Sequence, residues 1–115
     1  MKGNDSDKIR ILHIKEAIAE IEQYCNEAGI ENFQSNSMLR NAVIRQLEII
    51  GEAASNITPL FKAKHAQIQW RSIVGLRNIL VHEYFGIDTE LVKQIVEHDL
   101  PELKEQIIHV IEKVK

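Results

Sequence analysis

The sequence has little of what usually holds small extracellular domains or metal sites together. Its 115 residues include one cysteine, two prolines and five glycines. Cys25 cannot form an internal disulfide, and one cysteine is too few for a zinc cluster. No apolar run reaches the length of a membrane span, and the polar opening Met1–Asp7 lacks the apolar core of a signal peptide. These absences predict a soluble cytoplasmic protein with no membrane association.

Motifs for several common chemistries are also absent. The five histidines form no metal-ligand spacing such as His-x3-His; they are His13, His65, His82, His98 and His109. There is no glycine-rich phosphate loop, and no nucleophile elbow supports a Ser-His-Asp triad. We therefore expect no metal and no cofactor.

What is present is the composition of a globular helical protein. Apolar residues make up 44% of the chain and charged residues 27%, so it should fold rather than stay disordered. A chain of 115 residues is long enough to bury a core, and scarce glycine and proline favour long elements. We predict a single domain, residues 1–115, with an all-α fold.

The apolar periodicity predicts four to five main helices in a bundle, with no credible strand. The first helix should cover residues 7–28, with Asp5, Ser6 or Asp7 as its N-cap and Gly29 at its end. Its expected core residues include Ile9, Leu12, Ala17 and Ile21. The others are expected at about 36–56, 60–65 (after Thr58-Pro59), 70–84 and 89–98, with a last helix that starts afresh at Asp99-Leu100-Pro101. Leu91 and Ile108 are expected to face inward in the last two.

The charge distribution is uneven. From Ser37 to His82 there are six basic and two acidic residues, a sum of +4, whereas the rest of the chain has eight basic and fifteen acidic residues, a sum of −7. A positive middle could attract phosphate, or it could be ordinary variation of surface charge. Within this region Glu52 lies next to an apolar face, so it could be paired or line a site, or simply be solvated.

One stretch, Trp70–Asp88, combines polar residues with packing residues in a way that a plain helix does not need. Arg77, Asn78, His82 and Tyr84 fall within eight residues. On an ideal helix Asn78 and His82 share one line, whereas Arg77 and His82 lie about 140° apart. If both act on one phosphate, the arginine must curl round or a second helix must complete the site. A symmetric dimer through this helix would supply that second helix.

Such a set could cleave RNA through the neighbouring 2′-hydroxyl without a metal. His82 has a suitable pKa for proton transfer, and the guanidinium fork of Arg77 matches a phosphate. Asn78 could orient His82, and Tyr84 could donate to phosphate, stack on a base or hold Arg77. Each residue alone has a simpler interpretation: a structural or solvated histidine, an exposed arginine, a surface asparagine and a tyrosine at the edge of the core.

The segment Arg77-Asn-Ile-Leu-Val-His82-Glu-Tyr84 resembles the Arg-x4-His-x-Tyr signature of HEPN-domain proteins. The surrounding sequence resembles the HepT toxin family in four segments: Ile49-Ile-Gly-Glu-Ala-Ala54, Trp70-Arg-Ser-Ile-Val-Gly75, His82-Glu-Tyr-Phe-Gly-Ile-Asp88 and Asp99-Leu-Pro101. The resemblance covers roughly residues 7–112.

The resemblance implies a helical bundle that dimerises, with two signature helices lining a shared cleft. It implies a metal-independent endoribonuclease toxin with Arg77 and His82 catalytic and Asn78 supporting them. It also implies a nucleotidyltransferase antitoxin of the MntA type that transfers AMP from ATP to Tyr84, blocking the cleft by bulk and charge.

The sequence therefore leads to the hypothesis of a homodimeric, HepT-like RNase toxin. The alternative is a non-catalytic helical module that binds a nucleotidyltransferase or RNA. A third possibility is a structural subunit in which Arg77 and Tyr84 have no function.

Overall fold

The computed structural model describes residues 2–82 and 88–114, with the side chains of residues 2–5 and 77–82 left aside. Over these ranges the chain forms helices and no strand: α1 (Lys2–Ala28), the 3-10 turn η1 (Ile30–Asn32), α2 (Ser37–Ser55), α3 (Pro59–Lys64), α4 (Trp70–His82), α5 (Thr89–Gln94), the π-helical turn η2 (Ile95–Asp99) and α6 (Leu100–Val114). The predicted all-α fold is confirmed.

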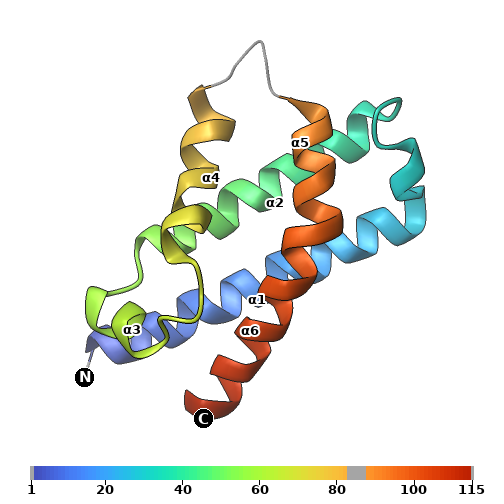
Figure 1. Cartoon of the computed structure of the whole chain (residues 1–115). Coiled ribbons are helices and arrows are strands. Elements are labelled where there is room, and N and C mark those ends of the chain that lie inside the picture. Colours follow the sequence, from blue (N-terminus) through green and yellow to red (C-terminus); the bar gives the residue numbers. More distant parts are fainter. Residues whose placement is uncertain (1, 83–87, 115) are drawn as a thin grey trace.

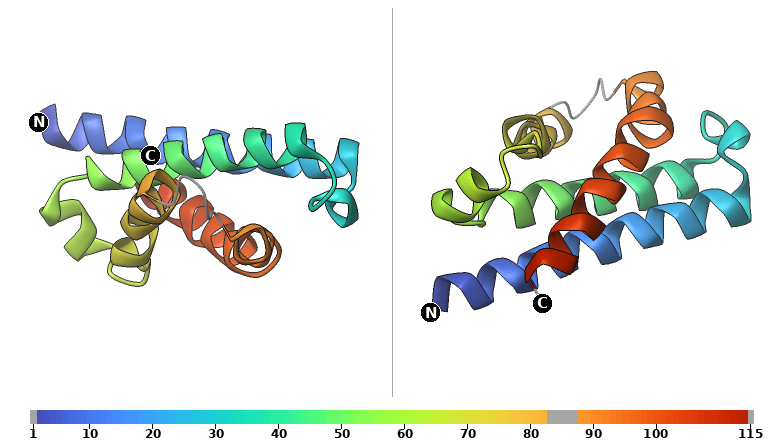
Figure 2. Two further views of the ribbon diagram at one scale, coloured as in Figure 1. Left: turned by 90° about the horizontal axis from the view of Figure 1, so that it is seen from above. Right: turned by 60° about the horizontal axis from the view of Figure 1, so that its bottom comes forward.

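The helices form two layers (Figures 1 and 2). The long helices α1 and α2 run antiparallel and make one layer, and α3, α4 and the continuous run from α5 to α6 lie on one side of it. Helix α4 packs on α2, and α6 packs on α1. The core lies between the layers and includes Ile14, Ile18, Val43, Leu47, Ile50 and Ile107, each less than 3% exposed.

The start of α1 differs from the prediction. The helix begins at Lys2, so Asp7 lies inside it and does not cap it. Instead the buried Asp7 carboxylate accepts hydrogen bonds from the Thr58 backbone N–H (2.9 Å) and hydroxyl (2.6 Å), 51 residues away. Thr58 in turn caps α3 by accepting from the Phe61 N–H. Asp7 thus joins α1 to the start of α3.

The buried face of α1 also differs. Of the four predicted core residues Ala17 and Ile21 are buried, whereas Ile9 and Leu12 are about half exposed and Ile11, Ile14 and Ile18 fill the core in their place. Because α1 carries apolar residues on more than one side, its spacing allows two stripes. The packing of both α2 and α6 on this helix decides which one is buried.

The boundaries around α2 and α3 follow the local signals. Gly29 ends α1 with φ +85°, and Asn36 caps α2 by accepting from the Leu39 N–H at 3.0 Å. Pro59 occupies the first turn of α3, where its missing N–H costs nothing.

The predicted break at Asp99 is wrong. The Leu100 N–H donates to the Ile95 carbonyl, a five-residue π-type bond, and the helix continues through Pro101 into α6. The wider turn gives the proline ring room that an α-helical turn would deny it.

Leu91 and Ile108, which were expected to face inward, are 39% and 37% exposed, whereas Val92 and Val110 are buried. None of the described helices is long and apolar enough to cross a membrane.

Candidate functional site

Helix α4, which carries three of the predicted site residues, is held at its first turn. The Trp70 indole N–H donates to the His65 carbonyl at 3.0 Å, and the Trp70 backbone N–H donates to the Ile68 carbonyl at 2.9 Å. Trp70 and Ile73 are both buried, which seats this end of α4 on the layer formed by α1 and α2. The start of α4 is therefore fixed relative to α2 and α3.

The backbone of α4 sets the register of the predicted site residues. At about 100° per residue, position 77 lies on the side of α4 occupied by the buried Trp70 and Ile73. Positions 78 and 82 lie on the side of Arg71, which is exposed. Positions 77 and 82 thus fall on different sides of one helix, as the spacing indicated. The side chains at both positions, and the whole of Tyr84, lie outside the described residues.

Helix α2, on which α4 packs, carries Glu52, the other residue that the sequence singled out. The adjacent Gly51 is buried. Glu52 is exposed, and its carboxylate accepts from the Asn56 amide at 3.5 Å. With Arg10, His13 and Arg45 it lines a surface concavity of about 330 Å³. Glu52 is therefore a surface residue in a mixed-charge hollow.

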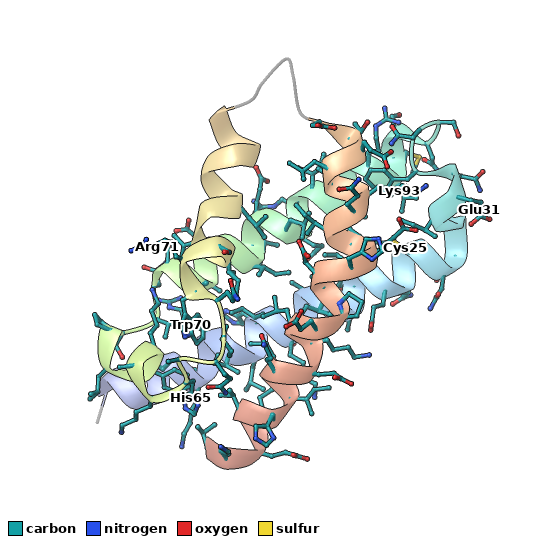
Figure 3. All side chains as sticks on the ribbon, in the orientation of Figure 1. Cys25, Glu31, His65, Trp70, Arg71 and Lys93 are labelled. Carbon is teal, nitrogen blue, oxygen red and sulfur yellow. The ribbon has the colours of Figure 1, made fainter. Side chains whose placement is uncertain are left out.

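A second concavity, of about 580 Å³, lies where α3 leads into α4. Its polar lining residues are Lys62, Gln67, Gln69, Arg71 and Ser72, and none of the carboxylates that the structure describes lines it. In Figure 3, Arg71 lies on the side of α4 away from α5, which carries Lys93. We call this hollow the α3–α4 basic concavity.

Sequence reasoning did not single out Lys62 or Arg71 as site residues. Two signals were present: the positive charge of the middle region, and the spacing of Arg71 from Asn78 and His82 by seven and eleven residues. That spacing puts all three backbone positions on one side of α4.

Three titratable groups in the described chain have shifted pKa values. Burial, and then the hydrogen bond and negative charge of Glu20, raise the pKa of the Tyr24 hydroxyl. Burial, and the positive charges of Lys113 and Lys64, lower the pKa of His65. Burial, and then the charge of Glu97, raise the pKa of the Cys25 thiol, which keeps it protonated and a poor nucleophile. Among the residues described, no three histidine, cysteine or acidic side chains are grouped to hold a metal ion.

Comparison with known proteins shows which family the chain resembles. Residues 14–110 match the family described as HepT-like, ribonuclease HepT-like. A "Probable ribonuclease HepT" of Thermococcus cleftensis is 42% identical over 99 residues, which are 86% of this chain and 90% of that protein. A "Putative RNase" of Methanocaldococcus jannaschii is 41% identical over 100 residues, 87% of this chain and 92% of that one.

A longer relative matches through part of its length. The M. jannaschii protein named "Gamma-glutamylcyclotransferase and putative RNase" is 39% identical over 107 residues, 93% of this chain but 48% of that protein. No solved structure gives a significant match. The family match covers most of the chain and agrees with the helical fold and with the signature on α4; the chain belongs to the HepT-like ribonuclease family.

Proposed function

We propose that this protein is an endoribonuclease that cleaves RNA through the neighbouring 2′-hydroxyl, with Arg77 and His82 as its catalytic residues. One observation carries the proposal: a chain of the HepT-like ribonuclease family holds an arginine, an asparagine and a histidine on the last two turns of one anchored helix. The residues act as parts of a single domain, and the site requires no metal.

The reaction would proceed by attack of the ribose 2′-oxygen on the adjacent phosphorus. The new bond joins the 2′-oxygen to phosphorus, and the bond from phosphorus to the 5′-oxygen breaks. The products are a 2′,3′-cyclic phosphate and a 5′-hydroxyl. In this scheme His82 takes the proton of the 2′-hydroxyl and a proton is delivered to the leaving 5′-oxygen, transfers that suit an imidazole because it titrates near neutral pH. Arg77 stabilises the charge that develops on the phosphorane oxygens, and Asn78 orients His82 from one turn away.

A dimer would complete the site. Positions 77 and 82 lie about 140° apart on α4, so one helix does not readily direct both side chains at one phosphate. Two copies of α4 related by a two-fold axis would bring the arginine of one protomer opposite the histidine of the other.

The first test is RNA cleavage by purified His82→Ala and Arg77→Gln variants, with His98→Ala and Arg45→Gln as matched controls at exposed positions. We expect the two α4 variants to lose activity and the controls to keep it, with or without EDTA. A wild-type dimer that cleaves no RNA and causes no growth arrest would instead support a non-catalytic binding module.

A mixing experiment tests the shared site. When Arg77→Ala and His82→Ala protomers are co-refolded, half of the dimers are mixed, and each mixed dimer keeps one intact site of two. Activity should return to roughly a quarter of the wild-type value. No recovery, with mixed dimers shown to form, would mean that each protomer supplies both residues to its own site.

We further propose that the protein is the toxin of a toxin–antitoxin pair, controlled by a nucleotidyltransferase that transfers AMP to Tyr84. The added phosphate would repel the RNA backbone from the cleft. Intact mass and fragment mapping after co-expression with such a partner test this, with Tyr84→Phe as the variant that should accept no AMP. An unmodified wild-type protein that the partner still inhibits would show neutralisation by binding.

A further inference from the structure

The α3–α4 basic concavity differs in charge from other hollows on the described surface. Lys62 and Arg71 line it, and no carboxylate in the described part of the chain does. By contrast, the hollow between α4 and α6 includes Asp99 and Glu102, and the hollow between α1 and α6 includes Glu22 and Glu97. The hollow between α1 and α2 includes Glu48 and Glu52. In a chain of net charge −3, a positive hollow of about 580 Å³ is a local exception.

The two cations in this hollow are available to a ligand. The side chains of Lys62 and Arg71 make no hydrogen bond or ion pair with the part of the chain that the structure describes. Arg71 is exposed and Lys62 is half-buried. Lys64 and Lys113 add positive charge near the buried His65 of the α3–α4 connection, where both lower its pKa. An anion entering the hollow would therefore meet two cations that pair with no described side chain.

The concavity is continuous with the side of α4 that leads to the proposed catalytic end. Arg71, Gly75, Asn78 and His82 occupy backbone positions spaced by four, three and four residues, which form one stripe along the helix. A Cβ built at Gly75 meets no atom of the described residues within 4 Å, so within the described part of the chain this stripe is open at its middle. From position 71 to 82 the helix rises about 16 Å, on the order of five nucleotides of a stacked strand.

We propose that the α3–α4 basic concavity binds the phosphate backbone of the RNA strand that flanks the cleaved linkage, with Arg71 and Lys62 each contacting a phosphate. This rests on the proposed ribonuclease function and extends its site along α4. The guanidinium fork of Arg71 suits a phosphate, and single-stranded nucleic acid is commonly held in a positive groove that follows its backbone. A second copy of this face is less suitable, because a two-fold contact would bring like charges together.

The test measures RNA binding in a His82→Ala background, so that the strand stays intact. Binding of a fluorescent single-stranded RNA of mixed sequence is followed by anisotropy from 50 to 300 mM salt. The variants are Arg71→Gln, Lys62→Gln and the double variant. Arg45→Gln and Lys93→Gln are controls with the same charge change on other faces of the molecule (Figure 3 labels Lys93).

Each lost phosphate contact should reduce the slope of log affinity against log salt by about 0.7. At 0.1 M salt this corresponds to about fivefold weaker binding for each single variant and about 25-fold for the double variant. Arg71→Lys keeps the charge and should keep most of the slope, and the thermal unfolding of each variant confirms that it is folded.

The opposing outcomes are distinct. Unchanged slopes, equal losses in the controls, or no RNA binding by any variant would overturn the inference. So would variants that change the oligomeric state, or the affinity for a protein partner, while RNA binding stays the same. If binding depends on Arg71 and Lys62 but wild-type protein cleaves no RNA, the inference stands and the proposed ribonuclease function fails.

Discussion

Replacement of Gly75 by alanine should stabilise the fold and reduce the function together. Gly75 lies in the interior of α4, where glycine is a poor helix former because its unfolded state has excess conformational freedom. No residue that the structure describes requires a glycine there, since an added Cβ meets none of their atoms within 4 Å. The gain in helix propensity is therefore not offset by a clash.

The expected gain is about 0.5–1 kcal/mol in the free energy of unfolding. For a domain of this size it corresponds to a rise in Tm of about 2–5 °C. Thermal and urea unfolding of Gly75→Ala and wild type, at equal protein concentration, measure it. A lower Tm would refute the reasoning, because it would mean that the assembled protein already fills the space beside Gly75.

Gly29→Ala is a matched control of opposite sign. Gly29 has φ +85° and ψ 115°, a conformation that residues with a side chain rarely adopt. The new Cβ would also lie 2.6 Å from the Glu31 carboxylate, although that flexible side chain can move away. We expect this variant to lose about 1–3 kcal/mol of stability. The same chemical change should thus stabilise one glycine site and destabilise the other.

The functional half of the prediction is read from RNA cleavage. The methyl group of Gly75→Ala would lie in the stripe that joins Arg71 to Asn78 and His82, where we propose that the strand passes. A more stable variant with reduced cleavage would fit that path. Full activity in the stabilised variant would show that RNA does not approach this side of α4.

Two further predictions concern the start of the chain and the α3–α4 connection. Asp7→Ala removes a buried carboxylate that accepts two hydrogen bonds from Thr58, so we expect the free energy of unfolding in urea to fall by about 2–4 kcal/mol. In a double-mutant cycle with Thr58→Val the two losses should not be additive. Additive losses would contradict the contact. The lowered pKa of His65 means that its unfolded state binds a proton more readily, so the stability that the neutral residue contributes is complete above about pH 6.5 and is lost as the pH falls through the lowered value. His65→Gln should flatten the dependence of unfolding free energy on pH in this window, and an unchanged slope would assign the dependence to another group.

Local signals in the sequence were enough to predict the fold class and most helix ends. Asn36, Thr58 and Asp88 cap the helices that follow them, and Gly29 ends α1, because each acts on backbone groups a few residues away. The register of Arg77, Asn78 and His82 likewise needed only the periodicity of an α-helix. Such features depend on neighbours in the sequence and can be read without a tertiary structure.

Other features were decided by contacts between distant parts of the chain. Asp7 looks like a local cap, yet it binds Thr58 because the packing of the helices brings the start of α3 beside it. Ile9 and Ile11 are equally apolar, and only the placement of α2 and α6 determines that Ile11 is buried. The α3–α4 basic concavity depends on the angle at which α4 leaves α3, which no local pattern encodes. The candidate site residues and their spacing could therefore be identified from the sequence, whereas the surface that we propose guides a substrate to them required the assembled helices.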